Sequence, residues 1–416
     1  MNNTSINNNS STQESSSVTV YPNGRRYYIF LVAYLVGLSA FGSFVNDMYL
    51  PSLPEMTRYF GCSVSTVQLG LTMGMIGLGL GQLILGPVSD KYGRKPVLIG
   101  AMIVFMIGAV ASVFSPTIHF FLGCRLVQGL GASGGYFLAR TIPADIYQGR
   151  PLAKMMALIG AINGFAPASA PVLGGLVSQD HGWKAVFWIL AGLAAFLLCV
   201  AIPLKESLKP DRRFKGKLLD AFGEYPALLK NKRFMIHVTL KGTALGLLFA
   251  YCSSAPFIMQ THFGWSQLHF GLFMGFNAIF IAVGAMIAVK FKILKQAASL
   301  GGILLFIATA VQVAVLFLID DFWAYELMML PILFSLGMIF TVGNTLAMNE
   351  GRDNAGGASA VLGLAGYVFG ATVAPLVGLG NIMHSTAIVF AVMATLILLS
   401  SYASSRLSPD PNMLKK

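Results

Sequence analysis

Long stretches without a charged residue are the feature that most limits what this chain can fold into. Such stretches lie between Arg26 and Asp47, Lys154 and Asp180, Lys184 and Lys205, Lys295 and Asp320, and Glu326 and Glu350. A helix needs about 20 apolar residues to cross a bilayer, and each stretch can supply one such helix. Only 11% of the 416 residues are charged, whereas a soluble domain carries about 25%. We therefore predict an integral membrane protein.

Longer apolar stretches hold more than one span. The stretch from Pro96 to Cys124 is broken at Ser115-Pro116, so that the next helix continues through Arg125. The run over 242–289 breaks near Gly264, and the run over 354–405 breaks between Gly378 and His384. Residues 59–89 hold one helix and another surrounds Lys241. The sequence thus predicts an all-α membrane protein with twelve transmembrane helices.

The basic residues indicate the orientation. Alternate loops are rich in them, with Arg25, Arg26, Lys91, Arg94, Lys95, Arg150, Lys154, the 205–233 cluster, Lys290, Lys292, Lys295, Arg352, Arg406, Lys415 and Lys416. The remaining loops hold only Arg58 and Lys184. By the positive-inside rule both termini are cytoplasmic. The net charge of +12 is therefore a topology signal with anionic lipid headgroups as its partner, and not a nucleic-acid-binding surface.

Polar segments divide the chain. Residues 1–24 are rich in Asn, Ser and Thr and are predicted to be a disordered cytoplasmic tail without the pattern of a signal peptide. Residues 205–233 carry nine Lys/Arg against four acids. A short amphipathic helix on the inner membrane surface is expected there, from Leu218, Leu219, Phe222, Tyr225, Leu228 and Leu229. We expect six-helix bundles over 25–204 and 234–405, joined by this linker, and a cytoplasmic tail over 406–416.

The two bundles share short sequence matches. Ala170-Pro171-Val-Leu-Gly174 in the fifth span corresponds to Ala374-Pro375-Leu-Val-Gly378 in the eleventh. Glycines, with one alanine, are also spaced to form one helical face in each half, where small residues let helices pack closely. These are Gly70, Gly74, Gly77 and Gly81 in the second span, and Gly363, Gly366, Gly370, Ala374 and Gly378 in the eleventh.

The turn after the second span has the sequence Gly86-Pro-Val-Ser-Asp90-Lys-Tyr-Gly93-Arg94-Lys95-Pro96. Gly93 allows the backbone to reverse, and Asp90 and Arg94 can pair with each other or with a neighbouring helix end. This string closely resembles the signature between the second and third helices of major facilitator superfamily transporters. The resemblance implies a conformational latch, in which Asp90 would hold the start of the eleventh span and a fourth-span arginine, Arg140, while the inner side is closed.

Arg125-Leu-Val-Gln128-Gly129-x-Gly131 resembles the fourth-span motif of drug:proton antiporters, whose arginine is buried and implicated in proton handling. A charge at membrane depth is costly and is a functional candidate, although Arg125 can alternatively extend to the outer face. The glycines from Gly129 to Gly134 also fit a dinucleotide-binding pattern, but they follow no strand, which excludes that function.

The fifth span resembles the antiporter motif of the same family. Ala170, Pro171, Gly174 and Gly175 occupy its characteristic positions, with alanine where the family has glycine before the proline. Pro171 removes a backbone hydrogen bond and is expected to bend the helix. Asn46-Asp47-Met48-Tyr49-Leu50-Pro51 is similar to the bicyclomycin-resistance-like branch of these antiporters.

Asp47 is the one acid near membrane depth in the first half, and two interpretations of it remain open. A partly desolvated carboxylate can exchange protons near neutral pH, which would make Asp47 a proton-coupling residue together with Arg125. Alternatively, Asp47 accepts backbone hydrogen bonds before a proline-rich turn.

Polar residues within the spans are candidates to line a central cavity: Asn46, Gln128, Arg140, Asn163, Lys241, Asn277 and Asn344. Lys241 lies eight residues past Arg233, about 12 Å along a helix. A cavity with Arg140 and Lys241 would suit an anionic substrate. Alternatively, Lys241 extends inward to the membrane surface, and Arg140 pairs with Asp90 or Asp145.

These observations predict a secondary transporter that exports a drug or metabolite in exchange for protons, by alternating access at a midplane cavity. The alternative is a dedicated transporter of an anionic metabolite or polycarboxylate siderophore. An enzyme or sensor is disfavoured, because the sequence has no catalytic cluster, metal-binding spacing or nucleotide motif. The four cysteines are expected to be free thiols. We expect a monomer in a bacterial inner membrane, with a proton gradient and no cofactor.

Overall fold

The structure is a computed structural model that describes residues 24–216, 225–352 and 355–407, and all regular structure within them is helical. The long helices are α1 (Gly24–Asp47), α3 (Val64–Tyr92), α4 (Arg94–Val113), α5 (Ile118–Ile146), α6 (Gly149–Val200), α8 (Lys232–Pro256), α9 (Gln267–Val289), α10 (Leu294–Leu318), α11 (Phe322–Glu350), α12 (Ala355–Val373) and α13 (Ile382–Arg406). Two short helices, α2 (Leu53–Phe60) and α7 (Tyr225–Lys230), lie between them.

The predicted twelve spans and all-helical fold are confirmed. Ten helices of the described chain are long and apolar enough to cross a membrane. One of them, α6, has 52 residues and turns at Gly182, whose φ of 71° is left-handed, so that α6 crosses twice. The 29 residues of α5 add a further crossing that carries Arg125 and Arg140.

The predicted breaks lie where the helices end. The α4 helix ends at Val113, just before Ser115-Pro116. Gly264 and Gly380 have φ values of 73° and 76°, which suit a residue without Cβ. Gly264 lies between a π-helical turn (Phe257–His262) and α9, and Gly380 precedes α13.

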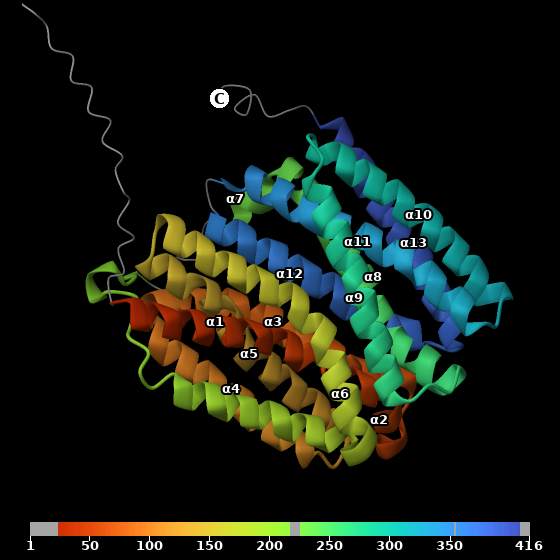
Figure 1. Ribbon diagram of the computed structural model, residues 1–416, viewed down its shortest axis with the longest axis horizontal. Helices are drawn as coiled ribbons and strands as arrows, with labels where there is room; N and C mark the ends of the chain where they lie inside the picture. Colours follow the sequence, from red (N-terminus) through yellow and green to blue (C-terminus); the bar gives the residue numbers. More distant parts are fainter. Residues whose placement is uncertain (1–23, 217–224, 353–354, 408–416) are drawn as a thin grey trace, which may run out of the picture.

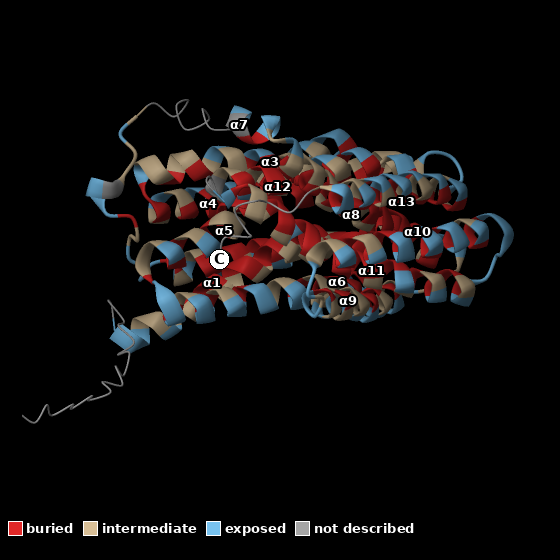
Figure 2. Cartoon of the chain, turned by 90° about the horizontal axis from the view of Figure 1, so that it is seen from above, coloured by how far each residue is buried: buried red, intermediate tan, exposed pale blue. Residues whose placement is uncertain are grey.

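Helices α1 to α6 gather on one side of the molecule and α8 to α13 on the other (Figure 1). We call these the first and second halves. They meet where α3 packs against α12 and where α6 packs against α9. Buried residues concentrate between the helices, as Figure 2 shows, and exposed ones face outward.

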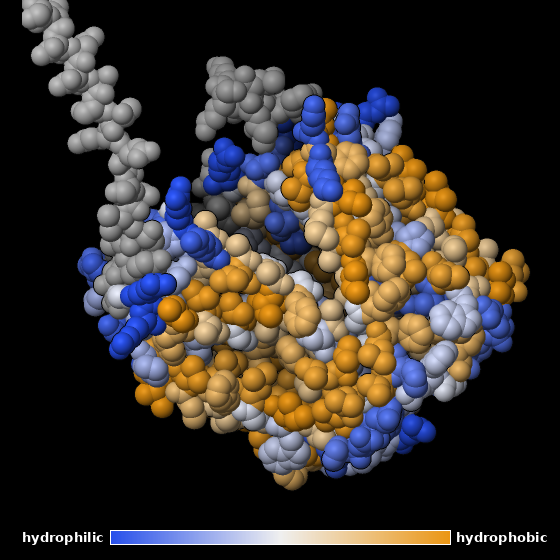
Figure 3. All heavy atoms as spheres, in the orientation of Figure 1, coloured by the Kyte–Doolittle hydropathy of each residue, from blue (hydrophilic) through white to orange (hydrophobic). Residues whose placement is uncertain are grey.

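The outer surface suits lipid. Large apolar side chains are exposed on many helices, including Ile107, Phe196, Phe276, Ile307 and Leu399. Hydrophobic side chains cover most of the middle of the face in Figure 3, and hydrophilic ones gather mainly at its margins. Soluble monomers rarely expose apolar areas of this extent.

The segment between the halves is only partly described. Residues 205–216 lie against the turn between α3 and α4, where the Phe214 amide donates to the Asp90 carbonyl oxygen at 2.9 Å. Of the predicted amphipathic helix, α7 covers the last part, whereas Leu218, Leu219 and Phe222 lie outside the described residues. The predicted terminal tails also lie outside them, apart from Gly24, Arg406 and Leu407.

The glycine face of the second span packs against α5. A Cβ on Gly77 would meet the Leu126 carbonyl oxygen, and one on Gly129 would meet the Gly74 carbonyl oxygen. Gly81 similarly packs against Ser133. The two backbones approach so closely that only glycine fits. In the eleventh span, Gly366 packs against Leu245 of its own half, whereas Gly378 packs against Gln68 of the other.

We expect Gly129→Ala to lower the unfolding temperature of the detergent-solubilised protein. Its new Cβ must push α3 and α5 apart, and overpacking of this kind costs about 1–3 kcal/mol. Gly123→Ala on the same helix is the matched control, because a Cβ there meets nothing within 4 Å. Equal unfolding temperatures for the two variants would contradict this packing.

Candidate functional site

A cavity of about 350 Å³ lies between the two halves. Small-molecule sites usually have volumes of about 300–1,000 Å³. Its walls come from both halves, so that a bound molecule would contact each of them. Its polar lining residues are Ser43, Asn46, Asp47, Gln82, Tyr136, Arg140, Asn163, Lys241, Tyr251, Cys252, Asn277, Asn344, Ser359 and Tyr367.

All but one of the predicted cavity residues line this space. Asn46, Arg140 and Asn163 do so from the first half, and Lys241, Asn277 and Asn344 from the second. Gln128 does not. Its side chain is fully buried and donates to the Gly108 carbonyl oxygen at 3.1 Å and to Ser112 Oγ at 2.7 Å. The sequence shows that Gln128 is polar and intramembrane, but not which way it faces.

Three charged side chains lie on the cavity wall: Asp47, Arg140 and Lys241. The Lys241 Nζ donates to Asn344 Oδ1 at 2.9 Å. Arg140 donates to Tyr136 Oη at 2.8 Å, and its guanidinium carbon lies 4.3 Å from the centre of the Tyr136 ring. Arg140 thus takes an aromatic partner where the sequence suggested an acidic one.

Arg125 lies inside the first half, with no exposed surface. Its Nη1 donates to Gln128 Oε1 at 2.6 Å, its Nη2 to the Val45 carbonyl oxygen at 3.2 Å and its Nε to the Gly70 carbonyl oxygen at 3.3 Å. The guanidinium carbon is 4.3 Å from the centre of the Tyr49 ring. This burial excludes the alternative that Arg125 extends to the outer face.

The Arg125 contacts tie α5 to α1 and α3 beside Asp47. Val45, whose carbonyl accepts from Arg125, lies two residues before Asp47 at the end of α1. Between them, Asn46 is buried, and its Oδ1 lacks a hydrogen-bond partner. The Asp47 carboxylate on the cavity wall is therefore next to a backbone segment that the buried Arg125 guanidinium holds in place.

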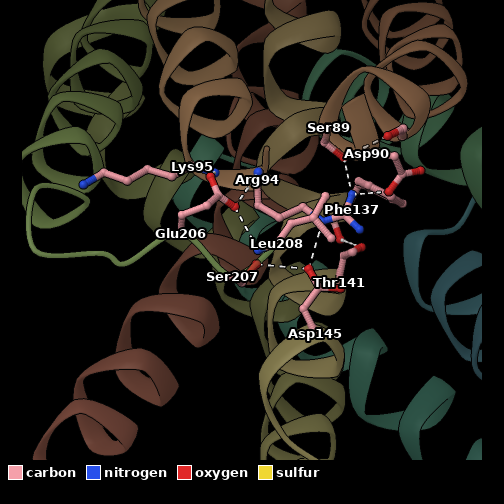
Figure 4. Close-up of polar contacts among 11 residues, drawn as sticks. Ser89, Asp90, Arg94, Lys95, Phe137, Thr141, Asp145, Glu206, Ser207 and Leu208 are labelled. Atoms are coloured by element: carbon pink, nitrogen blue, oxygen red, sulfur yellow. Dashed lines mark hydrogen bonds and ion pairs between the residues drawn. The ribbon is translucent and has the colours of Figure 1, made fainter. Parts of the chain in front are cut away.

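The predicted latch residues meet around Arg94 (Figure 4). Arg94 is buried and pairs with Asp90 at 2.5 Å and with Asp145 at 2.9 Å, and it donates to Ser89 Oγ at 2.6 Å. The pair of Asp90 with Arg140 is predicted for the state whose inner side is closed; in this structure Asp90 pairs with Arg94, across the turn at Gly93. Residues 353–354, at the start of the eleventh span, lie outside the described residues.

Glu206 completes this cluster from the segment after α6. It accepts hydrogen bonds from the backbone amides of Arg94 at 2.8 Å and Lys95 at 3.1 Å. These amides begin α4, where an acidic side chain satisfies unpaired donors and interacts favourably with the helix dipole. Gly93 leaves room for it, with a φ of 105°, and Lys95 Nζ donates to the Ile202 carbonyl oxygen at 2.8 Å. A Cβ on Gly86 would lie 3.7 Å from the Phe137 ring.

Hydrogen bonds join the halves at the end of the molecule away from Arg94. Ser65 Oγ donates to the Pro375 carbonyl oxygen at 2.8 Å, and Gln68 Nε2 to the Ser253 carbonyl oxygen at 2.9 Å. Others run from Thr72 Oγ1 to the Ala371 carbonyl oxygen, from Gln260 Nε2 to the Pro51 carbonyl oxygen, from Gln267 Nε2 to Glu55 Oε2 and from the Leu268 amide to Gln179 Oε1. This end is therefore closed.

The antiporter-motif residues lie at this closed interface. Pro171 lines the cavity, and Ala170 is fully buried. A Cβ on Gly174 would meet the carbonyl oxygen of Met48, which follows α1, and one on Gly175 would meet the Gln267 carbonyl oxygen of the second half. Small residues are needed here because two backbones touch α6.

Several wall residues were not predicted from the sequence. Four further polar residues line the cavity: Gln82, Tyr136, Tyr251 and Tyr367. The sequence feature that could have identified them is a polar side chain inside an apolar span. Glu326 was used only to mark the end of such a span, but its side chain is buried in the second half, with 3% of its surface exposed.

We expect Arg125→Lys to lower the unfolding temperature. A lysine ammonium has no planar fork to reach Gln128 and the carbonyls of Val45 and Gly70 together. Each buried acceptor that loses its donor costs about 1–3 kcal/mol. Arg140→Lys is the control, since that side chain is exposed to the cavity and donates one hydrogen bond. The prediction fails if both variants unfold at the wild-type temperature.

Residues 35–375 match the family model of the Major Facilitator Superfamily. Among curated relatives, the uncharacterized MFS-type transporter YdgK of Bacillus subtilis is 34% identical over 373 residues, which are 86% of this chain and 93% of YdgK. A chloramphenicol resistance protein of Pseudomonas aeruginosa is 29% identical, over 67% of this chain and 66% of that protein. The multidrug resistance protein MdtL of Shigella dysenteriae is 27% identical, over 85% of this chain and 90% of MdtL.

Solved structures have the same fold. A bacterial homologue of the human lysosomal transporter Spinster, in an inward-facing and unoccupied conformation, matches with a TM-score of 0.73 and 15% identity, over 93% of this chain and 100% of that one. The xylose transporter XylE of Escherichia coli matches with a TM-score of 0.69 and 18% identity, over 92% and 99%.

Proposed function

This chain belongs to the Major Facilitator Superfamily, and we propose that it is a proton-coupled antiporter of the bicyclomycin-resistance-like branch that exports a small drug or metabolite from a bacterial cell. The names of the chloramphenicol and multidrug resistance relatives support a drug as substrate. The proposed site of action is the inner membrane, with the protein as a monomer and the proton gradient as its energy source.

The observation that carries the proposal is a cavity between two halves that are joined at one end. In alternating access, the two halves rock about a central site, which opens to one side of the membrane at a time. The hydrogen bonds near Ser65 and Gln68 close the end away from Arg94. By the positive-inside rule that end faces outward, so this conformation would receive substrate from the cytoplasm.

The Asp90–Arg94–Asp145 cluster lies at the other, cytoplasmic end and within the first half. We assign it the role of a released latch in this conformation. When the cytoplasmic end closes, Asp90 would turn from Arg94 toward the start of the eleventh span. An ion pair that is partly exposed contributes about 0–1 kcal/mol, which is small enough to be exchanged in each cycle.

Asp47 is the proposed proton carrier of the first half. Its carboxyl group lines the cavity, and the buried Arg125 is held to the adjacent backbone. A proton on Asp47 and a substrate in the cavity can then exclude each other. One charge that crosses ~100 mV supplies about 2.3 kcal/mol. That energy maintains roughly a fifty-fold substrate gradient, at about 1.4 kcal/mol per decade.

The expected behaviour of Asp47→Asn in proteoliposomes is loss of the acceleration of chloramphenicol transport by an imposed pH gradient, because no carboxyl remains to bind the proton. Asp180→Asn removes an exposed carboxylate of α6 close to its turn at Gly182 and should keep the acceleration. Flux of radiolabelled chloramphenicol with and without the gradient measures the difference. A gradient response that survives in Asp47→Asn would remove this residue from the coupling mechanism.

A second candidate function rests on the two bases in the cavity. Lys241 and Arg140 outnumber Asp47 on its walls, and two cations favour a substrate with carboxylate groups. An anionic metabolite or a polycarboxylate siderophore has this chemistry, with transport in either direction.

Lys241→Ala separates the two functions. If the cavity binds anionic substrates, we expect this variant to bind polycarboxylates such as citrate more weakly and to bind chloramphenicol nearly as the wild type does. Lys290→Ala removes an exposed lysine at the end of α9 and controls for net charge. Calorimetric titration of purified protein with each compound is the measurement. Unchanged binding of every anionic compound by Lys241→Ala would eliminate the anionic substrate.

A further inference from the structure

Glu326 is a carboxylate buried inside the second half. It is the fifth residue of α11, one turn past its start at Phe322. Only 3% of its surface is exposed, and its neighbour Tyr325 is fully buried. At 1.5 Å per residue, Glu326 lies about 6 Å inside the helix start. The side chain points into the packed bundle, so the polar membrane surface does not solvate it.

Neither carboxylate oxygen of Glu326 makes a hydrogen bond of normal geometry, and the Asn277 amide is its one interacting polar neighbour on α9. The ion pairs among the described residues involve Arg94 and His262, and not Glu326. An isolated charge in an apolar interior costs several kcal/mol. A carboxyl group that carries a proton avoids this cost, and it gains one O–H donor.

The groups around Glu326 supply no fixed positive charge. On α8, Tyr251 lies near it, and on α11 the adjacent residue is Tyr325. On α9 the nearby group is the Asn277 amide. The one charged residue of α10 is Lys295, at the far end of that helix, and the one titratable residue of α12 is Tyr367. The charge of Glu326 is therefore controlled by a proton and not by a neighbouring base.

A short polar path connects Glu326 with the cavity. Asn277 Nδ2 donates to Tyr251 Oη at 2.7 Å, and both residues line the cavity. The Asn277 Oδ1 is buried and makes no hydrogen bond, and the carboxylate oxygens of Glu326 are buried in the same way. Glu326 thus lies behind Asn277, a residue of the cavity wall.

We propose that Glu326 is a second proton-binding site, which exchanges its proton with the cavity past Asn277 and Tyr251 and couples the second half to the transport cycle. The inference rests on the proposed proton-coupled transport. Glu326 accepts a proton from water when the cavity opens to one side, and it returns that proton to water when the cavity opens to the other. Only its carboxyl O–H bond forms and breaks.

Infrared difference spectroscopy of the full-length protein in lipid tests the protonation directly. The C=O stretching band of protonated carboxylic acids should lose one component in Glu326→Gln, and Asp47→Asn and Glu350→Gln should retain that component. Glu350 is the matched control, because it ends the same helix and is partly exposed. A Glu326→Gln spectrum identical to that of the wild type would overturn the proposal. Loss of the band on replacing K⁺ with Na⁺ would also overturn it, because the site would then bind Na⁺.

Transport in proteoliposomes tests the coupling. Glu326→Gln should lose the acceleration of chloramphenicol transport by an imposed pH gradient, because its side-chain amide binds no proton. Glu326→Asp keeps a carboxyl group and should restore part of that acceleration, which a merely structural role would not predict. If the wild type responds to the gradient and Glu326→Gln responds equally, this inference fails alone. A wild type that does not respond would instead refute the proposed antiport.

Discussion

The structure depends on one constraint: inside lipid, each backbone donor and acceptor must find its partner within the protein. Helices meet this requirement segment by segment, which is why the long charge-free runs become α-helices and why turns fall at positions such as Gly182, Gly264 and Gly380. Where two helices must then approach each other without the hydrophobic effect, small residues permit backbone contact. The glycines of α3 and α5 do this between Gly77 and Gly129.

The same constraint makes each polar residue inside the bundle informative. Arg125 is held by Gln128 and by the carbonyls of Val45 and Gly70, so its charge is buried with hydrogen-bond partners. Glu326 is buried without them. The first arrangement is a fixed element that organises the backbone beside Asp47. The second suits a group whose charge changes, and this difference underlies the assignment of separate roles to the two residues.

Much of the fold could be predicted because it depends on properties that are local in the chain. The span number and the breaks near Ser115 and Gly264 follow from the absence of charge and from residues that interrupt helices. Site prediction was partial. Polarity within a span identified Asn163 and Asn277, but helix rotation decides whether such a residue faces the cavity. Gln128 faces the neighbouring helix instead. The burial of Glu326 was not predicted, because this residue lies at the edge of an apolar run and its burial depends on how other helices pack around the helix end.

By itself, the sequence determined that this protein is a bundle of twelve helices, since the hydrocarbon thickness sets the length of each apolar run. It also placed Asp90 and Arg94 four residues apart, on either side of Gly93, close enough to pair. Only the tertiary structure decided that Arg94 joins Asp145 as well and that Asp47 and Lys241 share one cavity. These arrangements bring together helices that are distant along the chain. They depend on which helix faces pack against each other, and no local sequence pattern specifies that packing.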